Sequence, residues 1–365
     1  MPPAFPAFIG QRLRTEKFRL LDIGCSGGID EVWRAFGPRL QALGVDASKS
    51  ECRRLAEHER HPEVSYVAAF VSASANEPID LSAGPAAPLI MQMRDRLSFM
   101  RTREIREARL KAASTEEKLR HNAWELTGLA DPAKPIVVSD LLAERGWTEF
   151  DYFKVDIDGH DFEILQSLAG RLDALGVLAV QLEVNFVGTD SPQDHTFHNT
   201  DRFLRREGFD LFRLDVRTFS TRALPARYVW PTPAETVSGR PFQGEAYYAR
   251  DVLAPHRSAA NAALGIEKLA KLAAVFSAWA VPDAAAELLL ARRPDFSALL
   301  DVDAGLDLLA VEAQQSPKRP LSYRAYLQRF EADLPSFYRP EGPIPFRERL
   351  KSAWRGYWHP REKRF

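Results

Sequence analysis

The chain has 365 residues, of which 45% are hydrophobic and 27% charged, a composition typical of a globular protein and not of a disordered or fibrous one. Its formal net charge of −1 provides no overall attraction to nucleic acid or to an anionic membrane, so no nucleic-acid partner is expected. Two cysteines, Cys25 and Cys52, are too few for a disulfide framework, and neither a signal-peptide pattern nor a bilayer-length apolar run is found, which predicts a cytoplasmic protein.

A strand, a glycine-rich turn and a helix open the predicted fold. Residues 18–23 form an apolar run that predicts a buried strand, and the turn Gly24-Cys25-Ser26-Gly27-Gly28 follows it before a helix that begins near Glu31. Glycines let the backbone approach a ligand closely, and the helix N-terminus behind them favours polar or anionic groups. The pattern predicts the first half of a nucleotide-binding βαβ unit.

A carboxylate marks the end of the second predicted strand. The strand at 40–45 ends in Asp46, 22 positions after Gly24, where such units place an acidic residue on the ribose hydroxyls of an adenosine. Asp22 precedes the first glycine by two positions, and Ser26 stands where a dinucleotide enzyme has its second glycine. The turn therefore resembles the D-x-G-x-x-x-G turn of S-adenosylmethionine (SAM) methyltransferases. The residues expected around the cofactor are Asp22, Gly24, Cys25, Ser26, Gly28, Asp46, Ala47, Ser48, Phe70, Val71 and Asp156.

The next elements predict a parallel, doubly wound sheet with an insertion. A helix at 49–59 and a third strand at 64–71 continue the alternation, which then stops at an insertion of about 82–130. Its helical part, 89–120, carries nine Lys or Arg between Arg94 and Arg120, interleaved with acidic residues. This pattern is compatible with a solvated helical face, or with a lid whose arginines meet an anionic or sugar-phosphate acceptor.

The remaining chain divides into the rest of the sheet and a helical extension. Further strands are expected at 136–138, 150–157, 177–186, 209–214 and 246–249, and helices at 259–280, 282–291, 296–315 and 321–332. We therefore expect one α/β domain over 1–252 and an α-helical extension over 253–365. Residues 339–365 carry eight Lys or Arg against three Glu, interleaved with aromatics. This tail either docks its aromatics on the body or offers a basic-aromatic surface to an anionic membrane or a glycan-assembly partner.

Polar residues cluster where the predicted strands end. Asp156 and Asp158 close the fourth strand, and Glu183 and Asn185 close the fifth. In a doubly wound sheet a ligand binds outside the carboxyl ends of the strands, so we expect these groups to converge with the glycine turn and Asp46.

The fourth strand and its turn carry a more specific pattern. Residues 151–165, DYFKVDIDGHDFEIL, resemble the signature of the FkbM family of SAM-dependent methyltransferases, roughly D-x-x-K-I/V-D-I/V-E-G-x-E-x-x-I/V-L. Asp158 and Asp161 replace the usual glutamates, which keeps each charge and shortens each side chain by one methylene. The turn at 21–24 and the strand at 182–185 match the family in the same order, so the resemblance covers about 18–215 and leaves the insertion and the helical extension unexplained.

The resemblance implies a class I methyltransferase fold, a Rossmann-like doubly wound sheet, and O-methylation, often of sugar hydroxyls in polysaccharides or natural products. It implies that Asp22, Gly24 and Gly28 shape the SAM pocket, that Asp46 binds the ribose and that Asp156 faces the methionine end. A hydroxyl of high pKa must lose its proton as the new C–O bond forms. The candidate bases are His160, His195 and His198, and Asp158 and Glu183 could orient them. With Asp156, these are the candidate catalytic residues.

Alternative functions stay open at this point. Asp156, Asp158 and Glu183 could hold Mg²⁺ or Mn²⁺ and lower the pKa of an acceptor hydroxyl. An NAD(P)-dependent oxidoreductase or epimerase could use the same sheet, although the G-x-G-x-x-G turn is missing. The third alternative is a non-catalytic SAM-binding scaffold whose helices recruit partners.

Overall fold

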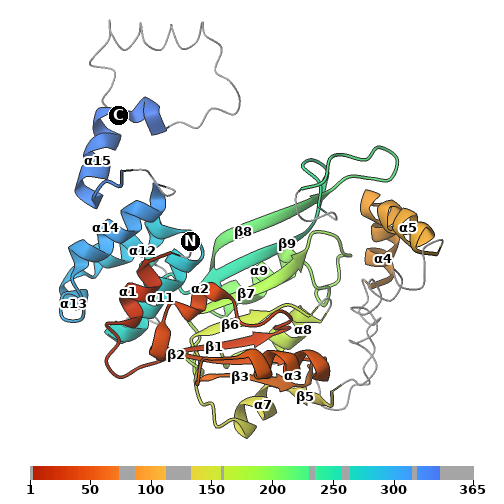
Figure 1. Cartoon of the computed structure of the whole chain (residues 1–365), viewed down its shortest axis with the longest axis horizontal. Helices are drawn as coiled ribbons and strands as arrows, with labels where there is room; N and C mark the ends of the chain where they lie inside the picture. The colour runs from red at the N-terminus through yellow and green to blue at the C-terminus, as the bar shows by residue number, and fades with distance from the viewer. Residues whose placement is uncertain are drawn as a thin grey trace, which may run out of the picture.

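The central feature is a twisted seven-stranded sheet (Figure 1). The structure, a computed structural model, describes residues 3–73, 87–111, 133–157, 160–229, 235–255, 264–314 and 319–337. Within them the strand order is β3-β2-β1-β6-β7-β9-β8, parallel except for β9, which runs antiparallel to both β7 and β8. The strands are β1 Phe18–Ile23, β2 Leu40–Asp46, β3 Val64–Ala68, β6 Tyr152–Val155, β7 Ala179–Asn185, β8 Asp210–Phe219 and β9 Arg240–Ala249. The predicted doubly wound α/β fold class is confirmed.

Helices flank the sheet and form two additions to it. Those connecting the strands are α2 Glu31–Arg34, the short 3-10 helix η1 Gly37–Arg39, α3 Lys49–His58, α7 Val138–Glu144, α8 Asp161–Gln166 and α9 Phe197–Arg206. The insertion contributes α4 Ala87–Asp95 and α5 Ser98–Lys111. The extension contains α11 Ile266–Ala278, α12 Pro282–Ala291, α13 Arg293–Phe296, α14 Val302–Ala313, α15 Tyr323–Ala332 and the 3-10 helix η3 Leu334–Phe337.

The strand predicted at 64–71 is divided in the structure. Only β3 pairs with β2, whereas β4 Phe70–Ser72 forms a separate two-stranded parallel sheet with β5 Pro135–Val137. The division occurs because β2 ends at Asp46. The amide of Ala69 still donates to the Asp46 carbonyl (2.9 Å), but the amide of Phe70 donates to Lys134 instead (3.0 Å). The strand predicted at 136–138 likewise lies outside the main sheet, and its last residue already begins α7.

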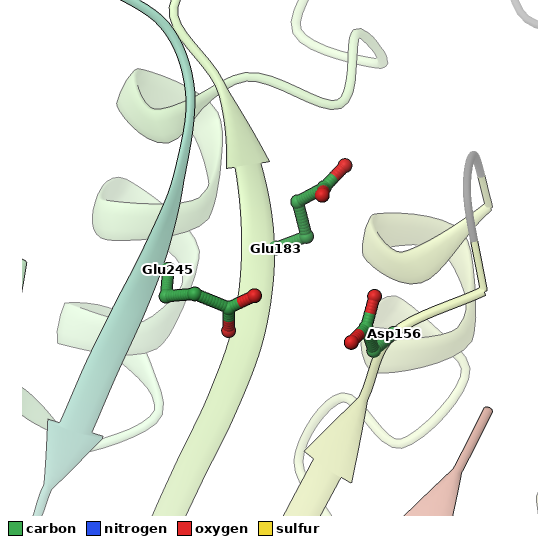
Figure 2. A group of neighbouring side chains, drawn as sticks. All are labelled: Asp156, Glu183 and Glu245. Carbon is green, nitrogen blue, oxygen red and sulfur yellow. The ribbon is translucent and has the colours of Figure 1, made fainter. Parts of the chain in front are cut away.

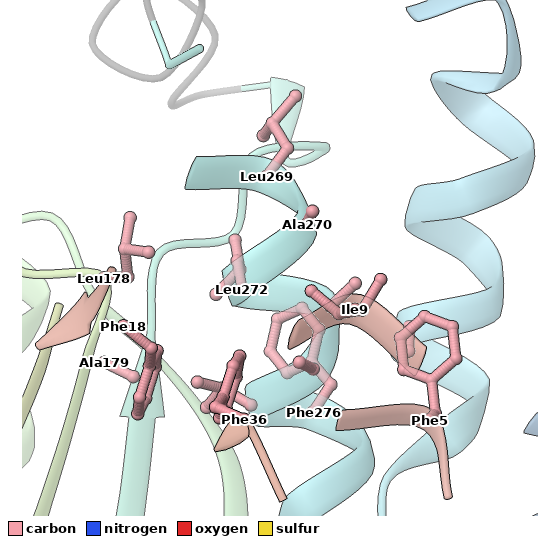
Figure 3. Packing of buried hydrophobic residues seen from close by; sticks show 14 of the residues in the cluster. Phe5, Ile9, Phe18, Phe36, Leu178, Ala179, Leu269, Ala270, Leu272 and Phe276 are labelled. Atoms are coloured by element: carbon pink, nitrogen blue, oxygen red, sulfur yellow. The ribbon is translucent and has the colours of Figure 1, made fainter. Parts of the chain in front are cut away.

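Alternating residues of each strand divide the core between the two faces of the sheet. Leu21, Phe153 and Val180 pack on the face that also buries residues of α7, α8 and α9. Tyr152 and Ala179 pack on the opposite face, together with α1 Phe5–Gly10 and the helices of the extension (Figure 3). The extension and the N-terminal helix α1 therefore share one continuous apolar core with the sheet.

A buried charge network fixes the extension at the amino ends of the strands. Asp151 is fully buried, and its Oδ1 lies 2.7 Å from Lys268 Nζ and 2.8 Å from Lys271 Nζ, both on α11. Its Oδ2 accepts from the amide of Arg19 (2.8 Å). We call the six side chains of this network the amino-edge cluster: Glu16, Arg19, Glu149, Asp151, Lys268 and Lys271.

The insertion packs at the other edge of the sheet, against the end of β8. Leu97 forms an isolated antiparallel bridge with Thr221, the hydroxyls of Ser98 and Ser220 lie 2.7 Å apart, and Met93 packs with Phe219. The insertion is therefore held at the carboxyl edge of the sheet, where the lid interpretation places it. Residues 82–86 and 112–130 of the insertion and the tail from 338 onward lie outside the described residues.

No helix in the described part of the chain is both long and apolar enough to cross a membrane.

Candidate functional site at the carboxyl edge of the sheet

The glycine turn after β1 lies against the end of β6. Gly24 has a φ of +88°, and a Cβ placed on it would lie 1.8 Å from the carbonyl oxygen of Asp156, so only glycine fits. Gly27 also has a φ of +88°, but a Cβ there would meet no atom within 4 Å. Its amide donates to Glu51 of α3 (3.1 Å), which fixes the turn against that helix. The turn is thus tightly packed at Gly24 and open at Gly27.

Asp46 lies at the end of β2 beside this turn, as predicted. Its Oδ1 accepts from the amide of Ser48 (2.7 Å), and Ser48 in turn caps α3. The carboxyl group is about half-buried, and burial raises its pKa. The local bonds orient Asp46 without enclosing it.

Some predicted cofactor-binding side chains point into the core. Cys25 is buried, with its Sγ against Gly44, where an added Cβ would come within 2.8 Å of it. Burial raises the pKa of this thiol far above its ordinary value. Val71 is buried among the residues of the α8 face. At these two positions only the backbone is available to a ligand, whereas Ser26 is exposed.

Three carboxylates converge from neighbouring strands. Asp156 follows β6, Glu183 lies on β7 and Glu245 lies opposite it on β9 (Figure 2). One oxygen from each lies within 4.8 Å of the other two. Like charges directly opposite one another in a sheet are destabilising, so this arrangement requires compensation.

Two cations provide that compensation. Lys154 Nζ lies 3.2 Å from Asp22 Oδ1 and 3.6 Å from Asp156 Oδ2. Arg217 of β8 contacts Glu183 (3.4 Å) and Glu245 (3.1 Å). We call these six side chains the carboxyl-edge cluster: Asp22, Lys154, Asp156, Glu183, Arg217 and Glu245.

Two amide side chains complete the hydrogen bonding of the glutamates. Gln243 Nε2 donates to Glu183 Oε1 (2.8 Å), and Gln181 Nε2 donates to Glu245 Oε2 (3.2 Å). Together with Arg217, these bonds engage both oxygens of Glu183 and of Glu245.

Burial and like charge perturb the ionisation of the cluster. Burial raises the pKa of Glu245, and the negative charge of Asp156 adds to the shift, against the opposing effects of Gln181 and Arg217. Burial opposes the charge of Lys154, but the carboxylates of Asp22 and Asp156 raise its pKa overall. The site therefore combines a permanent ammonium with a carboxylate that accepts a proton more readily than an exposed glutamate does.

The three candidate histidines occupy different positions. His195 is buried; its Nε2 donates to the carbonyl of Glu183 (2.8 Å), and its Nδ1 lies 3.7 Å from Asp161 Oδ2. His160 precedes α8, with its Nδ1 3.9 Å from Glu163, and His198 is exposed on the first turn of α9. This geometry makes His195 a residue that joins the β6–α8 turn to the end of β7. The other predicted catalytic residue of that turn, Asp158, lies outside the described residues.

Sequence reasoning found Asp156 and Glu183 but missed their partners. The partners that were not predicted are Lys154, Arg217 and Glu245 of the carboxyl-edge cluster, and the two amides that donate to its glutamates, Gln181 and Gln243. Lys154 was visible in the FkbM-like signature, and the period-2 pattern of a strand places Gln181 on the face that carries Glu183. For Glu245, Gln243 and Arg217 no such signal existed, because their positions depend on the pairing of β9 with β7 and β8.

Comparison with known proteins gives a family match and several similar solved structures. The Methyltransferase FkbM domain matches residues 109–211. Similar solved structures include a TehB-like SAM-dependent methyltransferase from Corynebacterium glutamicum, with 11% identity over 68% of this chain and 88% of that chain and a TM-score of 0.26. A putative S-adenosylmethionine-dependent methyltransferase from Listeria monocytogenes has 8% identity over 68% of this chain and 98% of that chain, with a TM-score of 0.31. A precorrin-6y C5,15-methyltransferase from Geobacter metallireducens has 10% identity over 67% of this chain and 87% of that chain, with a TM-score of 0.31. No curated protein matches the chain.

Proposed function

We propose, from the premise that this chain is a SAM-dependent methyltransferase carrying an FkbM domain, that it transfers the methyl group to a hydroxyl oxygen of a sugar or polysaccharide. The observation that carries the proposal is the group of three carboxylates at the carboxyl edge of the sheet, one of which has a raised pKa.

The residues present fit the cofactor. SAM supplies an electrophilic methyl group on a sulfonium. The open position at Gly27 and the carboxylate of Asp46 would receive the nucleoside, with Asp46 accepting from the ribose hydroxyls. Asp22 and Asp156 would face the cationic methionine end. The carboxyl-edge cluster has four carboxyl groups and two cations, so a cationic ligand improves its charge balance.

Glu245 is the strongest candidate for the base. A sugar hydroxyl is a poor nucleophile until its proton is removed, and a carboxylate with a raised pKa is better matched to that task than an exposed one. Glu183 and Asp156, within 4.8 Å of it, would accept hydrogen bonds from the acceptor and orient it for in-line attack. The excess of carboxyl groups favours a neutral polyol over a phosphorylated acceptor.

A metal-assisted variant of the same reaction is the second candidate. Asp156, Glu183 and Glu245 are hard oxygen donors close enough to share a divalent cation such as Mg²⁺ or Mn²⁺. However, each oxygen of the two glutamates already accepts from Arg217, Gln181 or Gln243, and a metal would have to displace these donors. We therefore favour the metal-free arrangement, for which activity persists in EDTA.

The test combines cofactor binding with methyl transfer. We expect SAM to bind in calorimetry and its methyl group to appear on oxygen in a panel of neutral sugars and oligosaccharides. Glu245→Gln should lower turnover by about 10²- to 10⁴-fold, the contribution of a positioned base, with SAM affinity retained. Glu207→Gln, which removes a carboxylate bound to the Gly170 amide, is the matched control.

The outcomes separate the alternatives. Absence of SAM binding would contradict the methyltransferase proposal, and nicotinamide binding would favour the oxidoreductase. SAM binding without transfer to any sugar would favour the scaffold, and loss of activity in EDTA with recovery in Mg²⁺ would favour the metal-assisted variant.

A further inference from the structure

A chain of hydrogen bonds connects the helical extension to the carboxyl-edge cluster. Trp279, which caps α11, donates from Nε1 to the hydroxyl of Tyr152 on β6 (2.9 Å). That hydroxyl donates to Gln181 Oε1 on β7 (2.5 Å), and Gln181 Nε2 donates to Glu245 Oε2 on β9 (3.2 Å). Four residues from four elements thus form one continuous path.

The donor-to-acceptor direction of this hydrogen-bond chain is set at Trp279. An indole N–H can only donate, so the Tyr152 oxygen must accept, and its single proton is available for Gln181. The amide of Gln181 must then present its oxygen to Tyr152, which leaves its NH₂ directed at Glu245. Glu245 receives a donor, and this favours its unprotonated form.

The path is rigid as well as directed. Tyr152 is fully buried and Trp279 is 2% exposed, with their ring centroids 5.9 Å apart. The backbone carbonyl of Trp279 accepts from Arg213 of β8 (2.5 Å), and α11 is held by the amino-edge cluster. The donor at the start of the chain therefore has little freedom to move.

We propose that the helical extension is a positioning element of the methyl-transfer site, in which Trp279 acts through Tyr152 and Gln181 to hold Glu245 as a hydrogen-bond acceptor ready to receive the proton of the acceptor hydroxyl. This inference depends on the proposed function in one respect, the role of Glu245 as base.

Other titratable or charged groups also face Glu245, and the test must separate their effects from that of the hydrogen-bond chain. Those that face it are Tyr152, Lys154 and Asp156 from β6 and its end, Glu183 from β7, Asp215 and Arg217 from β8, and Tyr247 from β9. Trp279→Phe replaces none of these residues, and it removes the indole donor to Tyr152, which is the first step of the hydrogen-bond chain. A shift of the Glu245 titration in that variant would therefore report the hydrogen-bond chain.

The experiment measures turnover against pH in EDTA, so that no metal ion binds Asp156, Glu183 or Glu245. It compares the full chain with the variants Trp279→Phe and Tyr152→Phe. Without the indole donor, the hydrogen-bond chain can reverse, and Gln181 can present its oxygen to a protonated Glu245. The acid limb of the pH profile should therefore move to higher pH. We expect a shift of about one pH unit, the size that corresponds to loss of one hydrogen bond to a charged group. SAM affinity should stay unchanged.

Trp33→Phe is the matched control, because Trp33 packs on the ring of Tyr152 (centroids 4.3 Å) and belongs to the same core. Gln181→Met, at a half-buried position, removes the last donor if the core variants fold poorly. The proposal would be overturned if the acid limb of the pH profile stayed in place in Trp279→Phe, Tyr152→Phe and Gln181→Met. It would also be overturned if Trp33→Phe shifted the acid limb equally.

A second readout is independent of the acceptor. The carboxyl ¹³C signal of Glu245, assigned with Glu245→Gln, can be titrated in the SAM-bound protein by NMR. If the wild-type protein methylates no sugar but the Glu245 titration moves upward in Trp279→Phe, the proposed function fails while the hydrogen-bond chain stands. If the titration does not move, the chain fails whatever the activity.

Discussion

The same sheet carries two ionic clusters, one at each end of its strands, and they are built differently. The amino-edge cluster has three acidic and three basic members, and its centre is closed: Asp151 is 0% and Lys271 is 1% exposed. The carboxyl-edge cluster has four carboxyl groups and two cations, and the side chains of Asp156 and Arg217 remain 36% and 39% exposed.

This difference separates stability from function. Buried ions that balance one another and are covered by α11 leave no capacity for a ligand, and they make the helix and the sheet depend on each other. An open cluster with excess negative charge contributes less to the stability of the fold, but it is suited to bind a cationic cofactor and to accept the proton of a hydroxyl. Variants at the two ends of the sheet test whether the two clusters differ in this way.

The largest effect on folding is expected at the amino edge. Asp151→Ala would leave the buried Lys271 and the partly buried Lys268 without their shared partner, which should lower the free energy of unfolding by about 3–5 kcal/mol. Urea denaturation measures this change. Asp303→Ala, which breaks an exposed pair with Arg293, should leave the midpoint essentially unchanged. A similar midpoint for both variants would contradict a structural role for the amino-edge cluster.

A smaller effect, on cofactor affinity and not on folding, is expected at the end of β2. Asp46→Ala should weaken SAM binding by about 10- to 100-fold, since a hydrogen bond to a charged group contributes about 1.5–3 kcal/mol. Calorimetry gives the affinity directly. The control is Asp30→Ser, which keeps a capping oxygen for the Val32 amide at the nearby start of α2. If Asp46→Ala binds SAM as the wild type does, Asp46 does not hold the ribose.

Local patterns were sufficient to predict most of this fold and three of the six side chains of the carboxyl-edge cluster, Asp22, Asp156 and Glu183. The glycine turn, Asp46 and the signature at 151–165 could be recognised because each depends on residues that are close in sequence. The division of the predicted third strand at Ala69 could not be recognised from the sequence. It arises because the chain pairs with β2 only as far as β2 extends and then pairs with β5. Glu245 and Trp279 were likewise inaccessible: both reach the site through contacts with strands that are distant in sequence, and one comes from an extension that the FkbM resemblance does not cover.

The smallest effect is expected at the histidine that sequence reasoning placed among the candidate bases. His198 is exposed on the first turn of α9, whereas Glu245 is largely buried and faces Asp156 and Glu183. If Glu245 receives the proton, His198→Ala should change turnover by less than about twofold, in line with exposed substitutions away from a site. Single-turnover kinetics at saturating SAM measures this. A loss of 100-fold or more, with SAM affinity retained, would return the role of base to His198 and would mean that the acceptor binds nearer to α9 than to the carboxyl-edge cluster.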